Sequence, residues 1–293
     1  MPEPTLPPPS PPAPPGLPAG DSGQPPGLWA AWSSARLLAW AGACLLGNTA
    51  VQSVTYALTD DIFLPVAAGG LLGMLLPTWL VARAHGCGLA RDFGFDRPRA
   101  GVLFWTAIAV AGSLAPTALL AALSARIRPV PPEWEALFTS HLPRTALATG
   151  GAFLAVAVAV PLAEELLFRG LLQRLAARRW GDAAGVLLGA LLFAILHLEP
   201  WYLLGLFGVG LLLGYVWAVT RSLTTCAVAH GLHNAAALTM MLRQGGEAGS
   251  PAVIERADWL WLAASLPVLA LGCAGLARAV RRERPCVPGT DHL

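Results

Sequence analysis

The chain has 293 residues, of which 55% are hydrophobic and only 12% are charged. Its mean hydropathy of +0.59 is too high for an ordinary soluble domain, so the composition predicts a membrane protein. The net charge of +2 is too small for a nucleic-acid-binding surface, and we expect no nucleic-acid partner. The five cysteines form no C-x-x-C pair, which argues against a disulfide framework or a zinc knuckle.

The N-terminal residues 1–27 are rich in proline and carry almost no charge. They lack the basic start and the apolar stretch of a signal peptide. Such a tract favours extended polyproline conformations and buries too little apolar surface to fold. We predict a disordered tail, and a ligand for a proline-reading domain is the alternative.

Eight apolar stretches follow this tail. A helix needs about 20 residues to cross about 30 Å of hydrocarbon, and all but the short fifth stretch approach or exceed that length. The stretches are residues 33–57, 62–83, 101–124, 145–173, 183–198, 201–220, 222–242 and 257–279. The sequence therefore predicts an all-α fold, a polytopic bundle of about eight transmembrane helices.

Arginine supplies every basic side chain of the protein, since the sequence contains no lysine. With the N-terminus in the cytoplasm, most of the arginines that flank the apolar stretches fall on the inner side, as the positive-inside rule requires. We therefore expect both termini in the cytoplasm. The arginine-only, alanine-rich composition is typical of a GC-rich bacterial genome, which predicts a bacterial cytoplasmic membrane.

The fourth stretch contains three charged residues, Glu164, Glu165 and Arg169. On insertion scales a charged side chain in lipid costs about 2.5–3.5 kcal/mol, so such groups are paired, hydrated or functional. Glu165 and Arg169 are four residues apart and face each other on a helix. We interpret them as a stabilising pair that could also orient Glu164.

Counting residues brings further polar groups to the level of Glu164. Glu164 lies 17 residues before Gly181 and His197 lies 16 residues after it, so antiparallel helices that turn at Gly181 bring the two level. His230 and Asn234 are four residues apart on the seventh stretch and share a face at a similar depth. Four polar groups that converge in lipid require each other or water, and we expect a water-accessible cavity within the membrane.

Two neighbouring residues have simpler interpretations. Phe193 lies one turn before His197, and we interpret it as a core-packing residue that could also help to shape the pocket. His233 points away from the face that His230 and Asn234 share. We expect it only to form a hydrogen bond with a neighbouring helix.

Three motifs thus occur in order on successive helices: Glu164-Glu165-x-x-x-Arg169, Phe193-x-x-x-His197 and His230-x-x-x-Asn234. Together they resemble the CPBP family of intramembrane proteases, the group of the type II CAAX prenyl proteases with its bacteriocin-processing and Abi-like relatives. With this resemblance the chain divides into four segments. They are the proline-rich tail (1–27), the first three transmembrane helices (28–143), a CPBP-like catalytic core (144–242), and the last transmembrane helix with a basic tail (243–293).

The resemblance implies hydrolysis of a peptide bond in a membrane-associated protein or peptide. Glu164 would act as the general base on a water molecule that His197 helps to hold. His230 and Asn234 would donate hydrogen bonds to the oxyanion of the tetrahedral intermediate. This scheme needs no cofactor. Glu164, His197 and His230 are also a possible ligand set for zinc, so metal dependence stays open.

Two functions of other classes compete with a protease. A non-catalytic membrane scaffold or immunity-type protein of the same family would keep the fold and act by binding partners. An ion or proton transporter would use the same intramembrane acids for flux. The presence of every motif residue favours the protease.

Overall fold

A computed structural model describes residues 32–244 and 256–283 of the chain. The described residues contain helices and no strand, which confirms the predicted all-α class. Six helical rods are long and apolar enough to cross a membrane. The short helix Asp182–Leu196 and the more polar helix Leu223–Arg243 complete the predicted set of eight. The predicted proline-rich tail, residues 1–27, lies outside the described residues.

Several of the rods consist of more than one helical element. The first half of the chain contains α2 (Ser34–Thr59), α3 (Phe63–Ala68), η1 (Gly69–Leu75), α4 (Leu76–Ala84), η2 (Leu89–Phe93), α5 (Ala100–Ile127) and α6 (Pro132–Ser140). The second half contains α7 (Ala146–Leu154), η3 (Ala155–Ala159), α8 (Val160–Glu165), η4 (Leu166–Gln173), α9 (Arg174–Trp180), α10 (Asp182–Leu196), η5 (Pro200–Tyr202), α11 (Leu203–Thr220), α12 (Leu223–Arg243) and α13 (Arg256–Glu283). Elements η1 to η4 are π-helical, and η5 is a 3-10 turn.

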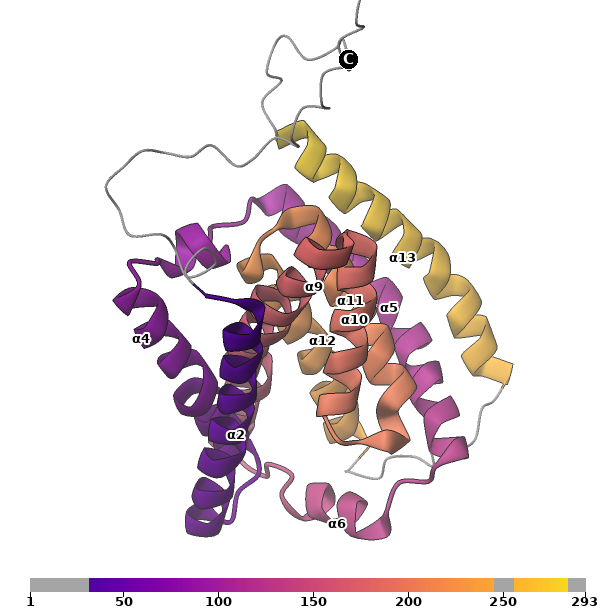
Figure 1. The fold of residues 1–293 in the computed structure, drawn as a ribbon. Helices are drawn as coiled ribbons and strands as arrows, with labels where there is room; N and C mark the ends of the chain where they lie inside the picture. The colour runs from indigo at the N-terminus through magenta and orange to yellow at the C-terminus, as the bar shows by residue number, and fades with distance from the viewer. Residues whose placement is uncertain (1–31, 245–255, 284–293) are drawn as a thin grey trace, which may run out of the picture.

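The rods pack as a bundle in which α13 lies along α5 on one flank, and α2 and α4 form the opposite flank (Figure 1). The longest rod joins α7, η3, α8, η4 and α9 without a break, from Ala146 to Trp180. Gly181 then reverses the chain into α10. Its φ of 87° is in the left-handed region that favours glycine, so this residue suits the turn of the predicted hairpin.

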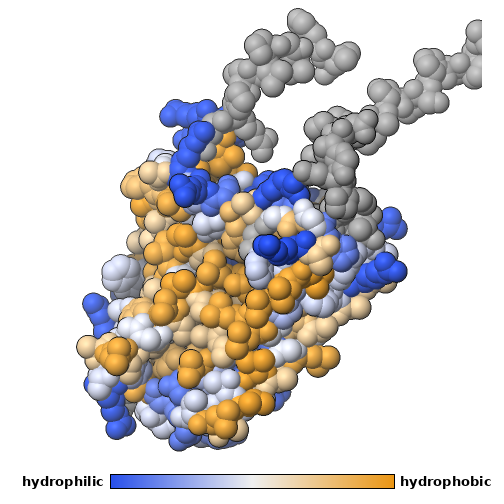
Figure 2. Space-filling model, turned by 90° about the vertical axis from the view of Figure 1, so that its left-hand side faces the viewer, coloured by the Kyte–Doolittle hydropathy of each residue, from blue (hydrophilic) through white to orange (hydrophobic). Residues whose placement is uncertain are grey.

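The surface has the pattern of a protein that spans a membrane. Figure 2 shows a broad apolar band across one face, with hydrophilic residues gathered at its two ends. Large apolar side chains such as Leu46, Leu58 and Leu147 are exposed along the rods. Because lipid tails solvate such side chains, this exposure is expected in an integral, multi-pass membrane protein.

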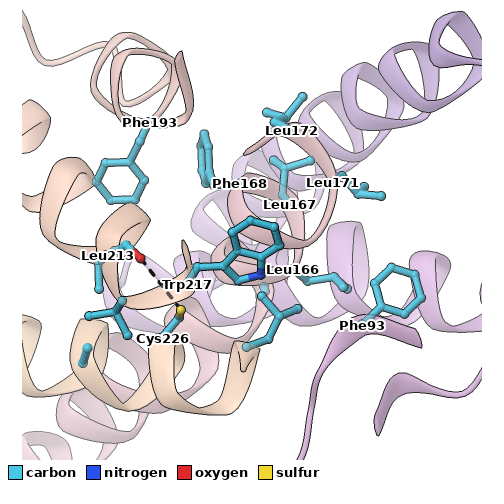
Figure 3. Packing of buried hydrophobic residues seen from close by; sticks show 14 of the residues in the cluster. Phe93, Leu166, Leu167, Phe168, Leu171, Leu172, Phe193, Leu213, Trp217 and Cys226 are labelled. Carbon is cyan, nitrogen blue, oxygen red and sulfur yellow. Dashed lines mark hydrogen bonds between the residues drawn. The ribbon is translucent and has the colours of Figure 1, made fainter. Parts of the chain in front are cut away.

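The main core lies where the middle of the chain is enclosed by other rods. Trp217 of α11 lies between Cys226 on one side and Leu166 of η4 on the other, and Phe168 and Phe193 lie side by side (Figure 3). The sulfur of Cys226 contacts the Leu213 carbonyl at 3.8 Å. Cys226 is fully buried, as expected of a small core residue.

Candidate active site

The charged residues of the first motif lie at the junction between α8 and η4. Glu164 and Glu165 are the last residues of α8, and Arg169 lies within η4. All eight residues of η4 are buried. A π-helical segment widens a helix locally, and such segments are frequent at functional sites.

Glu164 faces two histidines from two other helices. Its Oε2 atom lies 3.9 Å from Nε2 of His197 and 3.8 Å from Nε2 of His230. The match in level that counting from Gly181 predicts is therefore seen in the structure. The side chains of Glu164 and His197 keep 21% and 23% of their exposure, whereas that of His230 keeps 3%. Within the described part of the chain, Glu164 Oε2 has no hydrogen-bond partner.

Glu165 lies fully buried behind this group and holds two partners with one oxygen atom. Its Oε1 accepts hydrogen bonds from Arg169 Nη1 and from His230 Nδ1, both at 2.8 Å. The pair of Glu165 with Arg169 was predicted from the sequence. The bond to His230 was not, because it depends on how α12 packs against α8. Since an ionised carboxylate only accepts, Nδ1 of His230 carries the proton in this bond, and Nε2 is turned to Glu164.

Arg169 is a fully buried cation with contacts on several sides. It pairs with Glu165, and its Nη2 donates to the carbonyl of Gly210 on α11 at 3.3 Å. Its guanidinium lies 4.7 Å from the centre of the Phe193 ring. Pairing and cation–π contact of this kind compensate part of the cost of burying the charge.

His197 caps the C-terminus of α10, and the same helix holds its imidazole ring in place. Its Nδ1 donates to the carbonyl of Phe193 at 2.6 Å, which leaves Nε2 for the side of Glu164. The Phe193 ring packs 4.4 Å from the His197 ring between their centres, and Phe193 is buried, as predicted for a core residue. Leu198 then adopts a φ of 58°, a left-handed conformation that ends α10 directly after the histidine.

Asn234 does not join the group around Glu164 directly. Its Nδ2 donates to the carbonyl of Val156 in η3 at 2.9 Å. The neighbouring Gly231 lets the two backbones approach, since a Cβ atom there would lie 2.1 Å from the carbonyl oxygen of Ala157. The structure therefore brings Glu164, His197 and His230 together and ties Asn234 to the backbone of the long rod.

His233 has the simple role that its position predicted. Its Nε2 lies 3.1 Å from Oγ1 of Thr117 on α5, so the pair forms a hydrogen bond between helices. This contact leaves His233 outside the group around Glu164.

Two cavities lie on the α6 side of the site. One, of about 670 Å³, lies between α3, η1 and α7, and the other, of about 380 Å³, lies between α2, α3 and α6. Neither is lined by Glu164, His197, His230 or Asn234. The predicted water-accessible cavity at these four residues therefore stays a prediction.

A metal ion was the alternative use of the same side chains. Glu164, His197 and His230 have the donor atoms that catalytic zinc sites use. In the placement that the structure gives to the described residues, no three His, Cys, Asp or Glu side chains form a group able to hold one ion. Metal dependence at these three side chains therefore stays a prediction.

Comparison with protein families agrees with the motifs. Residues 147–236 match the family model of the Rce1-like type II CAAX prenyl endopeptidases. This stretch is similar to the Rce1-like domain. It runs from α7 into α12 and includes all seven residues that the sequence singled out for the site and its support. At the level of the family, the matched stretch resembles a CAAX protease. No curated protein and no solved structure matches the chain significantly.

Proposed function

We propose that the protein is an intramembrane endopeptidase that hydrolyses a peptide bond of a membrane-associated protein or peptide with water activated by Glu164. The observation that carries this proposal is the position of Glu164 Oε2, which faces Nε2 atoms of two histidines at 3.8 and 3.9 Å. Each histidine is held through its other nitrogen. The Rce1-like match over residues 147–236 supports the same reaction class.

The separations around Glu164 suit a reacting water molecule. They are longer than a direct hydrogen bond, and one water within reach of both Glu164 and His197 would satisfy the carboxylate oxygen. Because Nδ1 of His197 donates to a carbonyl, its Nε2 is an acceptor in the neutral ring and holds the second O–H of the water. Glu164 takes the first proton as the oxygen attacks the carbonyl carbon, and returns it to the leaving amine when the C–N bond breaks.

In the proposed reaction the other two residues, His230 and Asn234, bind the oxyanion. In this scheme His230, which Glu165 holds through Nδ1, donates a hydrogen bond to the oxyanion. Asn234 has two amide hydrogens, and only one of them is used by the Val156 carbonyl. This scheme uses the side chains of the protein alone and requires no cofactor.

We also propose that both termini face the cytoplasm of a bacterial cell. The described N-terminal end of α2 and C-terminal end of α13 lie at the same end of the bundle as the α9–α10 hairpin (Figure 1). That end carries Arg178, Arg179 and Arg221, and the positive-inside rule assigns it to the cytoplasm. Labelling single cysteines introduced at this end from one side of the membrane tests the orientation.

The test of the reaction is a comparison of newly formed peptide termini in cells that carry the wild type or Glu164→Gln at matched protein levels. The matched control is Glu133→Gln, because Glu133 is an exposed acid on α6. We expect termini that appear with the wild type and the control, and a cleavage rate lower by about 10²- to 10⁴-fold with Glu164→Gln. Equal termini in all three strains would contradict a protease and favour the non-catalytic scaffold.

The same experiment identifies a substrate with which metal dependence can be measured on purified protein. We expect cleavage that a chelator leaves unchanged. Loss of cleavage with the chelator and its recovery with Zn²⁺ would replace the scheme above by one that uses a metal ion.

A further inference from the structure

Gln173 is a buried polar residue that the three motifs do not include. It is the last residue of η4 and keeps 1% of its exposure. Its Nε2 donates to the carbonyl of Gly214 on α11 at 2.9 Å. One turn earlier, Arg169 donates to the carbonyl of Gly210 on the same helix. Two donors four residues apart on η4 therefore meet two carbonyls four residues apart on α11.

The side chain of Gln173 also fills the space between three helices. A Cβ atom added at Gly189 of α10 would lie 3.0 Å from Cβ of Gln173. One added at Gly214 of α11 would lie 3.2 Å from its Oε1. Because both glycines lack a Cβ atom, the Gln173 side chain fits between the helices. A change in its shape would therefore alter the packing of both α10 and α11.

These contacts lead to the site along α10. Gly189, Phe193 and His197 follow one another in steps of four residues on that helix, so the height at which Gly189 packs on Gln173 also sets the height of His197. At the other end of η4, Glu164 and Glu165 immediately precede the π-helical segment that Gln173 ends. Gln173 therefore lies where the helix of Glu164 and the helix of His197 are held against each other.

Gln173 is poorly explained as a residue that only stabilises the fold. Within the described residues its Oε1 is buried without a hydrogen-bond partner, which is unfavourable for an amide. An apolar side chain of similar volume would avoid that loss, and hydrogen bonds between membrane helices contribute only modestly to stability. Compared with an apolar side chain, the amide adds a hydrogen bond that fixes the position of Gln173 against the Gly214 carbonyl.

We propose that Gln173 is a positioning residue of the active site, which sets the register between the helix that carries Glu164 and the helix that carries His197. It acts through His197 and has no contact with the reacting atoms. This inference rests on the proposed role of the Glu164 and His197 pair.

The first test is kinetic and uses Gln173→Met, which keeps the volume and removes the donor. The matched control is Thr106→Val, because the fully buried Thr106 donates only within its own helix α5. We expect kcat to fall about ten- to hundredfold with little change in KM, since small misplacements of catalytic groups have effects of this size. The control should keep the wild-type kcat.

A double-mutant cycle with His197→Gln separates positioning from general damage. If Gln173 acts through His197, the Gln173→Met change should lower kcat by less than about twofold once His197 has been replaced. An equal loss of kcat in both backgrounds would overturn the proposal, because it would show an effect independent of that histidine.

The second test needs no substrate and reads the imidazole nitrogens by ¹⁵N NMR of histidine-labelled protein in nanodiscs. In the wild type, Nδ1 of His197 and Nδ1 of His230 should each carry a proton. We expect Gln173→Met to shift or average the His197 signals, while Thr106→Val leaves them unchanged. Should Gln173→Met fail to fold, Gly214→Ala presses on the same amide from α11 and should shift the same signals.

The two readouts distinguish this proposal from the proposed reaction. Altered His197 signals without any cleavage by the wild type would support the positioning role and contradict the protease. Cleavage with wild-type kcat and unchanged His197 signals in the variant would leave the protease in place and overturn the role of Gln173.

Discussion

Two segments of the rod from Ala146 to Trp180, α7 at its start and η4 in its second half, differ sharply in their surroundings. In α7, Ala152 is the single buried residue, and Leu147 keeps 88% of its exposure. In η4 all eight residues are buried, including Arg169 and Gln173. Lipid solvates an apolar side chain as well as a protein core does, whereas a buried charge or amide needs hydrogen-bonding partners from the protein. The polar and charged residues of the candidate site on this rod therefore lie in, or directly before, the segment that other helices enclose.

The largest expected effect comes from removing the buried cation of η4. Arg169→Met leaves the carboxylate of Glu165 buried without its cation, and breaking a buried pair in this way costs about 3–5 kcal/mol. We expect a lower unfolding temperature and loss of cleavage. Thermal unfolding in nanodiscs measures the first effect, with Arg178→Met on exposed Arg178 as the control. An unchanged unfolding temperature for Arg169→Met would mean that the pair is not buried as described.

A pair of leucine variants compares the stability contributions of α7 and η4 directly. Leu171 of η4 keeps 2% of its exposure, and Leu171→Ala should cost about 2 kcal/mol, mostly through the cavity that it leaves. Leu147→Ala at the lipid-facing end should change stability by less than about 0.5 kcal/mol. Equal losses in the two variants would show that α7 is covered by protein, for example in an oligomer.

The same glycine substitution at two places should change stability in opposite directions. A methyl group on Gly231 would lie 2.1 Å from the Ala157 carbonyl oxygen, so Gly231→Ala should cost about 1–3 kcal/mol and displace His230. Around Gly150 of α7 a Cβ atom meets no other atom within 4 Å. Gly150→Ala should therefore stabilise the helix by about 0.5–1 kcal/mol. If both substitutions shifted the unfolding temperature in the same direction, that result would contradict this difference.

The sequence alone determined the class of the fold and the level of the site. Stretch length and hydropathy predict the helices because a membrane-spanning helix is a local structure with its backbone bonds satisfied inside one segment. The position of Gly181 predicts the hairpin, and the rise per residue then brings Glu164 level with His197. The pairing of Glu165 with Arg169 follows in the same way from a spacing of four residues.

Only the tertiary structure decided which side of each helix meets protein and which meets lipid. Hydropathy does not distinguish the two, because lipid tails and a protein core are equally apolar. The bond from His230 to Glu165, the bond from Asn234 to Val156, and the place of Gln173 between three helices therefore appear only when the rods are packed. Each depends on the rotation of one helix against another, which no local spacing contains.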